Sequence, residues 1–415
     1  MGLAHADETE GLPREVEELR RRLAAVAEQL EEIRLGESGG TGGASSHGLA
    51  PSASKVYSAG QGVSLGGYGE ALYARSKVGD GEPSATTDFL RAVLYTGYKF
   101  DPNWLFNSEI EFEHASTGEG GEVSVEFAYL EYQWKPTLGL RAGLLLSPMG
   151  FINEMHEPTT YWGARRPETE RVVLPSTWRE NGAGVLGSAG PVDFRGYLLT
   201  GMNAQGYSPA GIRGGRQAGA QALAETFAGV VRLDLPAGGI GAVPGLSLAG
   251  SAYLGQAGQD LELDTDDGTL ELEVKTSIVE GHAEWNWRGL RVRALASRAT
   301  IGDVPRLNQV LELDPHATVG ETLTGGYAEV GFDLLSLGAG SRAALTPFVR
   351  LEQVNTQADV PTGFAPDGRN DREIVTAGLH FAPIAQVAFK LDHQVVDPAA
   401  GSTERRTHLG MGYIF

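Results

Sequence analysis

The 415-residue sequence predicts an all-β transmembrane barrel of about 16 antiparallel strands, preceded by an N-terminal α-helical coiled coil. Three observations support this prediction. From about residue 55, apolar and polar side chains alternate with a period of two, as on a sheet whose faces meet different surroundings. The connections between these segments are alternately long and short. The chain ends on an aromatic residue, Phe415, with Tyr413, Met411 and Leu409 on the same face of the last strand.

Composition excludes several classes of protein. The chain has no cysteine, which rules out disulfides, thiolate metal sites and cysteine nucleophiles. Its formal net charge of −20 argues against nucleic acid as a partner. No run of about 18 apolar residues occurs, so no transmembrane helix is predicted. Ala4-His5-Ala6 has the form of a signal-peptide cleavage site without the charged and apolar regions before it, so we expect a mature or trimmed chain.

Residues 13–35 form the strongest predicted helix. Spacings of four and three alternate between its apolar residues, as in the a/d positions of a coiled coil, at Val16, Leu19, Leu23, Val26, Leu30 and Ile33. Because three heptads are too short for a stable lone helix, we expect oligomerisation rather than a helix lying on a protein surface. The heptads do not choose between two and three chains. Residues 1–12 are a predicted tail, and the Gly- and Ser-rich residues 36–54 are a predicted flexible linker.

The barrel is predicted over residues 55–415, with the clearest alternation in 104–113. We expect sixteen strands, at 64–74, 88–99, 103–114, 122–134, 138–147, 182–188, 192–201, 223–234, 245–256, 270–287, 289–301, 321–334, 343–355, 372–382, 385–396 and 405–415. An even count returns the C-terminus to the end where the barrel begins. The alternation changes phase within 270–287. We therefore expect a β-bulge near 276–278 or, failing that, two strands and a different count.

Short turns at one end and longer loops at the other are typical of outer-membrane barrels, whose short turns face the periplasm. We therefore expect both termini, and the coiled coil, in the periplasm. Barrels of about 16 strands enclose an aqueous channel. The longest connection, 148–181, has apolar residues of its own and many charges. This suits a loop folded into the lumen, with a loop packed on the rim as the alternative.

Several stretches resemble one family of proteins. They are residues 66–70, 91–98 and 175–182 together with the Phe415 terminus, and their order is similar to that of the phosphate-selective porin O and P family and related coiled-coil porins. The resemblance covers about residues 64–415. It implies a sixteen-stranded trimeric porin of the bacterial outer membrane, with its third loop in the pore and anion selectivity. The ending at Tyr413 and Phe415 also resembles the signal read by the barrel assembly machinery of Gram-negative bacteria.

Candidate pore residues carry both signs of charge. The cationic candidates are Arg91, Arg141, Arg165, Arg166, Arg171, Arg179, Arg195, Arg232, Arg291, Arg293, Arg350 and Lys390. Guanidinium groups suit bidentate capture of phosphate or carboxylate, although they could equally pair with acidic residues between strands. The acidic candidates are Glu70, Glu109, Glu111, Glu113, Glu126, Glu154, Glu157, Glu168, Glu170 and Glu180. Phosphate-specific members of the resembled family carry a lysine-rich ladder, which this chain, with six lysines, lacks. The residues alone therefore leave the sign of selectivity open.

These observations predict a porin, a water-filled outer-membrane channel for passive diffusion of small, chiefly anionic solutes, with residues 148–181 as its constriction. We expect no metal and no cofactor. The expected partners are membrane lipid and lipopolysaccharide, the assembly machinery, small solutes and further copies in a homotrimer. The alternative is a structural anchor tethered through the periplasmic coiled coil. An enzyme is less favoured, because the histidines are scattered and neither a nucleophile elbow nor an H-E-x-x-H motif occurs.

Overall fold

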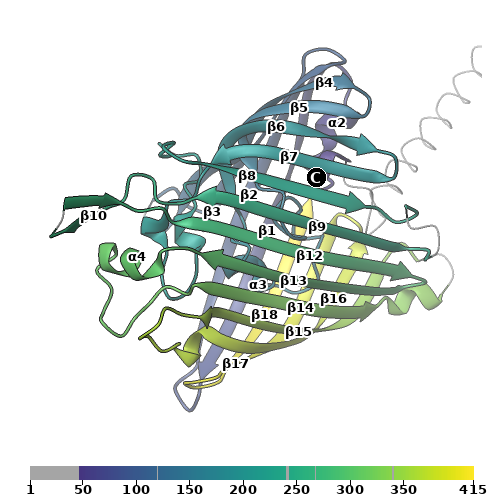
Figure 1. The fold of residues 1–415 in the computed structure, drawn as a ribbon. Helices are drawn as coiled ribbons and strands as arrows, with labels where there is room; N and C mark the ends of the chain where they lie inside the picture. Colours follow the sequence, from purple (N-terminus) through teal and green to yellow (C-terminus); the bar gives the residue numbers. More distant parts are fainter. Residues whose placement is uncertain (1–45, 119, 240–242, 267, 339–340) are drawn as a thin grey trace, which may run out of the picture. The chain divides into compact units, whose positions relative to one another are not determined.

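The computed structural model describes residues 46–118, 120–239, 243–266, 268–338 and 341–415. Within these ranges, sixteen strands close into an antiparallel barrel (Figure 1). Neighbouring strands follow the chain order except where β9 pairs with β12, because β10 and β11 form a separate two-stranded sheet. The predicted sixteen-stranded barrel is confirmed. The predicted helix 13–35, with its heptad residues, lies outside the described residues.

The barrel strands run as follows: β1 (Gly62–Val78), β2 (Ser84–Lys99), β3 (Trp104–Glu113), β4 (Glu122–Lys135), β5 (Leu138–Leu146), β6 (Arg179–Ala189), β7 (Val192–Thr200), β8 (Phe227–Leu235), β9 (Leu246–Gln256), β12 (Lys275–Trp287), β13 (Leu290–Ile301), β14 (Thr322–Phe332), β15 (Ala344–Asp359), β16 (Asp371–Ile384), β17 (Val387–Pro398) and β18 (Glu404–Ile414). The remaining elements are β10 (Glu262–Thr265), β11 (Gly268–Glu271), α2 (Lys55–Ser58), α3 (Thr169–Val172), α4 (Val304–Val310), η1 (Ser46–Gly48), η2 (Ala204–Gly206), η3 (Arg213–Gly215), η4 (Leu334–Leu337) and η5 (Gly368–Asn370). No helix in the described ranges is long and apolar enough to cross a membrane.

The connections sort by length between the two ends of the barrel. One end, called the short-turn end, has turns such as Arg288–Gly289, where both residues have positive φ (48° and 86°), as a tight type I′ hairpin requires. The other end, called the long-loop end, carries the connections 147–178, 201–226, 257–274 and 302–321. Strand β1 begins, and β18 ends, at the short-turn end, as the even strand count predicts.

The predicted bulge near 276–278 is wrong. Strand β12 pairs with both β9 and β13 in an unbroken register across these residues. The change of phase instead marks a break between β11 and β12, because 272–274 leave the sheet. Strand β11 pairs with β10 in a hairpin outside the barrel wall, so the segment contains two strands while the barrel still has sixteen.

The barrel has an apolar outer face and a polar inner face, the reverse of a soluble protein. Its outward positions expose large apolar side chains, including Leu94, Leu130, Val231, Leu254, Val279, Leu351, Leu391 and Leu409. Its inward positions bury charged ones, including Glu70, Glu109, Glu131, Arg141, Arg350 and Asp392. Exposed aromatic residues lie near the short-turn end, at Tyr98, Trp104, Trp134 and Trp287. An apolar outer face with aromatic residues at its edge suits hydrocarbon and its interface with water.

Two segments lie inside the barrel, and we name them here. The inner loop is residues 147–178, which include α3. The strap is residues 47–58, which include α2 and whose Leu49 and Val56 are 2% and 1% exposed. The predicted flexible linker, 36–54, therefore overlaps the strap. Residues 47–54 pack within the barrel unit instead of linking it to another part.

Candidate functional site

The inner loop crosses the lumen and is held from all sides. Its hydrogen-bond partners on the wall come from strands around the whole circumference: Glu70 of β1, Glu109 of β3, Arg232 of β8, Arg293 of β13, Tyr327 of β14, Glu352 of β15 and Asp392 of β17. Its apolar side chains Met149, Ile152, Val173 and Trp178 are at most 1% exposed. A loop that satisfies its polar groups on opposite walls and buries its own apolar residues has one defined position.

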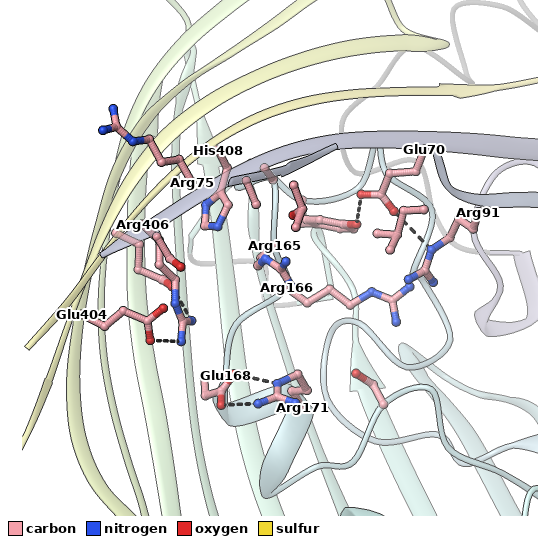
Figure 2. Close-up of a pocket in the computed structure, with 18 of the residues that line it drawn as sticks. Glu70, Arg75, Arg91, Arg165, Arg166, Glu168, Arg171, Glu404, Arg406 and His408 are labelled. Carbon is pink, nitrogen blue, oxygen red and sulfur yellow. Dashed lines mark hydrogen bonds and ion pairs between the residues drawn. The ribbon is translucent and has the colours of Figure 1, made fainter. Parts of the chain in front are cut away.

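A cavity of about 490 Å³ remains between the inner loop and the wall formed by β1, β2, β17 and β18. Seven arginines and three glutamates line it. One of the seven, Arg75, belongs to the outward positions of β1, and Figure 2 shows its guanidinium pointing away from the others. The cavity therefore has more cationic than anionic side chains even without Arg75.

Each lining glutamate has an arginine partner. Glu70 lies 3.4 Å from Arg91 of β2. In the inner loop, Arg171 donates to Glu168 at 2.6 and 2.7 Å. On β18, Arg406 donates to its strand neighbour Glu404 at 2.7 Å. These three pairs, which Figure 2 draws as dashed lines, account for all the carboxylates of the lining.

Besides Arg75, which points away, three lining arginines make no carboxylate contact within the described residues. Arg165 has neither a hydrogen bond nor an ion pair there, and its side chain is exposed to the cavity. Arg166 donates to the carbonyl of His156 at 3.4 Å. Arg213, from the loop 201–226, donates to the carbonyls of Arg171 and Ser176. We call Arg165, Arg166 and Arg213 the open arginines.

Burial and nearby cations lower the pKa of two open arginines, Arg165 and Arg213. Burial and Arg91 oppose a rise in the pKa of the third, Arg166, but Tyr161, Tyr68 and Glu70 raise it. Burial, followed by the positive charges of Arg406 and Arg171, lowers the pKa of Arg165. Burial and the guanidinium groups of Arg216, Arg171 and Arg166 lower the pKa of Arg213 to about 9. Both side chains stay cationic at neutral pH, so an anion in the cavity would relieve a repulsion already present there.

The predicted wall cations are placed differently, because each has a partner. Arg141 pairs with Glu131 at 2.9 Å, Arg179 with Glu126 at 2.7 Å, Arg195 with Glu154 at 3.3 Å and Arg232 with Asp234 at 2.9 Å. Arg91 lies between Glu70 and Glu111, 3.1 Å from the latter. Lys390 donates to the carbonyl of Gly163 at 3.0 Å and lies 3.7 Å from the centre of the Tyr161 ring. Of the predicted cations, the loop residues Arg165, Arg166 and Arg171 line the cavity together with Arg91.

Several of the predicted acidic residues bind the inner loop or belong to it and fix it in place. Glu109 lies 3.0 Å from His156, Glu170 accepts from Tyr327 at 2.6 Å, and Glu157 accepts from the strap. Tyr413 lies on β18, and the Phe415 carbonyl accepts from the amide of Gly67 at 3.0 Å, which joins the end of the chain to β1. The described residues contain no group of three or more His, Asp or Glu side chains suited to a metal.

Sequence reasoning missed Arg213 and Arg406. Arg213 lies between glycines in the second-longest connection, 201–226, which the structure folds back against the inner loop. The available signal was the pair Arg213 and Arg216 in a glycine-rich loop. Arg406 is on an inward position of β18, which strand parity alone could have identified.

Comparison with known sequences finds a relative in Aquifex aeolicus (strain VF5). That protein, described as uncharacterized, is 35% identical over 360 residues, which cover 83% of this chain and 78% of the relative. No family model matches the chain. The resemblance to the phosphate-selective porin O and P family therefore gains no support from these sequence comparisons.

Solved structures share the architecture at low identity. OmpF of Salmonella typhi, in a complex with daunomycin, has a TM-score of 0.54 at 12% identity and covers 85% of this chain and 97% of its own. The outer membrane channel DcaP of Acinetobacter baumannii has a TM-score of 0.52 at 12% identity, with the same coverage. OprB of Pseudomonas putida has a TM-score of 0.50 at 9% identity and covers 85% and 94%. The chain therefore belongs to the same family as the Aquifex aeolicus protein, and its barrel has the fold of outer-membrane porins.

Proposed function

We propose that this protein is a channel of the bacterial outer membrane for passive diffusion of small anionic solutes. The observation that carries the proposal is the set of open arginines, Arg165, Arg166 and Arg213, which face a lumenal cavity without carboxylate partners in the described residues. Rings of one charge in a narrow passage set the sign of permeant ions. Arginine also presents a planar pair of donors that matches carboxylate and phosphate groups.

The inner loop is the proposed constriction. Its contacts with strands on opposite walls support this role, because they place it across the lumen and leave a cavity between the loop and β1, β2, β17 and β18. The fold shared with OmpF and with the outer membrane channel DcaP supports a channel in general. The open arginines of the cavity support selectivity for anions over cations, but they do not indicate a preference for phosphate.

Single-channel recording in a planar bilayer under a KCl gradient tests the proposal. We expect stepwise conductance and a reversal potential that favours chloride. Steps that favour potassium would keep the channel but contradict anion selectivity, and would direct attention to Glu70 and Glu168 of the same cavity. No conductance from folded protein would contradict the channel and favour the structural anchor.

The assembly around the barrel is also a proposal. Residues 13–35 are proposed as a periplasmic coiled coil that joins three copies, after a tail at 1–12, and the barrel is proposed to contact lipid and lipopolysaccharide. The Phe415 terminus is proposed as the signal for the barrel assembly machinery. Crosslinking followed by an unheated gel tests the trimer, which a species of monomer mass alone would contradict.

A further inference from the structure

The strap lines one side of the lumen at the short-turn end. Leu49, Ala53 and Val56 belong to the buried apolar cluster that also contains inward residues of β1 to β5. The fit is close at Gly97 of β2, where a Cβ atom would lie 2.7 Å from the Cβ of Val56. Glycine at this wall position therefore provides the space that the strap occupies.

Polar contacts fix the strap to the wall at several strands. Tyr57 donates to Glu131 of β4 at 2.7 Å. The side-chain amide of Asn107 on β3 donates to the carbonyl of Ala53 at 2.9 Å. The Ser52 hydroxyl donates to the carbonyl of Phe415 at 2.5 Å. The strap is therefore held as firmly as a part of the wall, and it can serve as a support for what rests on it.

The inner loop rests on the strap through Glu157. One carboxyl oxygen, Oε1, accepts the backbone N–H groups of Ser52 and Ala53 at 2.9 and 3.0 Å. Glu157 is fully buried, and its other oxygen, Oε2, has no hydrogen-bond partner within the described residues. Burial raises the pKa of Glu157 to about 8, against the opposing effect of the two amides, and Glu109 adds to the rise. A buried carboxyl group with one unsatisfied oxygen persists where its other oxygen makes contacts that hold the surrounding structure.

We propose that the strap is part of the pore and positions the inner loop through Glu157. The inference rests on the proposed channel function and adds a residue and a segment to it. Glu157 precedes Tyr161 by four residues in the inner loop, and Tyr161 donates to Glu70 in the lining of the cavity. Holding Glu157 therefore constrains the stretch of the inner loop that carries two of the open arginines, Arg165 and Arg166.

The test combines two readouts on variants of the full-length protein. The chain has no cysteine, so Ala53→Cys places a single reporter thiol in the strap, and Leu49→Cys provides a second one if the first variant does not fold. We measure the labelling rate of that thiol by a membrane-impermeant maleimide, and the single-channel conductance. The background changes are Glu157→Ala, Glu157→Gln and, as a matched control, Glu170→Ala. Glu170 is a buried carboxyl of the same loop that binds Ile152 and Tyr327 but not the strap.

Glu157→Ala should raise the labelling rate about tenfold or more, because it removes both hydrogen bonds to the strap, and should make the conductance larger and noisier. Glu157→Gln should restore both readouts, because its amide oxygen still accepts from Ser52 and Ala53. Glu170→Ala should change the conductance without exposing the strap thiol. The inference would be overturned if Glu157→Ala changed neither the conductance nor the labelling rate of an active channel. It would also be overturned if Glu170→Ala raised the labelling rate as much as Glu157→Ala does. Wild-type protein without conductance would instead contradict the proposed channel, while the labelling rates would still report on the contact between strap and loop.

Discussion

Arginines of the barrel wall and arginines of the loops meet opposite surroundings within one lumen. Arg350 of β15 is 1% exposed and lies 3.4 Å from Glu329 and 3.8 Å from Glu352. Arg293 donates to Glu284 and to the carbonyl of Thr160 in the inner loop. Arg165, by contrast, is exposed and without a partner within the described residues. The same residue type therefore neutralises carboxylates in one region and supplies uncompensated charge in the other.

The difference shows where selectivity can reside. A buried guanidinium paired with a carboxylate contributes little to the electrostatic potential of the lumen, because the neighbouring negative charge compensates its positive charge. An unpaired guanidinium acts on any anion that enters the cavity. The wall arginines therefore mainly hold the structure around the inner loop, and in the proposed channel the loops supply the charge that acts on a solute. Four predictions test this division, from the largest expected effect to the smallest.

Removing the open arginines should abolish or reverse anion selectivity. In the triple variant with Arg165→Gln, Arg166→Gln and Arg213→Gln, we expect the ratio of chloride to potassium permeability to fall roughly tenfold or more. This is the change expected from losing the Coulomb attraction of three nearby charges for an anion in water. The reversal potential under a KCl gradient measures this ratio. The matched control is Arg291→Gln, a wall arginine that donates to Glu284 at 2.9 Å and should leave the ratio near its original value. If Arg291→Gln shifted the reversal potential more than the triple variant does, the wall arginines and not the loop arginines would determine selectivity.

Removing a wall arginine should instead cost stability. Arg350→Ala leaves the buried carboxylates Glu329 and Glu352 without their shared cation, which typically destabilises a protein by about 3–5 kcal/mol. Urea unfolding of the barrel in lipid vesicles measures the loss. Arg165→Ala, in the same assay, should be neutral or slightly stabilising, because burial and the cations Arg406 and Arg171 act on this charge more strongly than Glu168 and Asp392 do. A marked loss of stability from Arg165→Ala would show that the loop arginines also have a structural role.

The burial of Glu157 between the inner loop and the strap should become less favourable as pH rises, because the charge it then gains is desolvated. Glu157 has a folded-state pKa of about 8, above its ordinary value of 4.5. Its contribution to stability is therefore fully present below about pH 4.5 and is lost as pH rises through 8. The groups that face it are Glu109 of β3, Lys55 of α2 and the amides of the strap. We expect a larger and noisier conductance at pH 9 than at pH 6.

Glu157→Gln separates this effect from other titrations. Glu170 of the same loop, whose pKa burial raises to about 7, titrates in an overlapping range. The glutamine variant should therefore lose a part of the pH dependence and keep the part that comes from Glu170. A pH dependence unchanged by Glu157→Gln would assign all of it to groups away from the strap.

The strands could be predicted from the sequence because their signal is local. Alternation along 104–113 depends on that segment alone, and β3 spans the same residues. The failure at 270–287 shows the limit of such a signal. The change of phase was visible in the sequence, but whether it marked a bulge or a break depended on the pairing of β11 with β10, which residues 262–265 decide.

The sequence was sufficient to place charged residues in the lumen but not to predict which of them form ion pairs. Strand parity placed Arg195 and Arg232 in the lumen, while their shared partner Asp234 depends on the register between β7 and β8. The strap was missed for a related reason. Its Gly, Ser and Ala residues have the composition of a linker, yet small size is also what lets Ser52 and Ala53 bring their backbone close to Glu157. Composition does not distinguish these two uses of small residues.

The smallest expected effect concerns a loop arginine that does not line the cavity. Arg369 of η5 pairs with Asp367 at 2.5 Å, but its side chain is 77% exposed, where solvent screens the attraction. Arg369→Gln should change neither the reversal potential nor the urea midpoint beyond experimental error. The Arg369–Asp367 pair is as short as the ion pairs of the wall, and Arg369 lies in a loop. The variant therefore tests whether contact distance alone determines stability and whether a place in any loop determines selectivity. If short contacts decide stability, the midpoint should fall. If position in the loops decides selectivity, the reversal potential should move. Our comparison requires that neither happens, because burial determines the first effect and a place in the cavity determines the second.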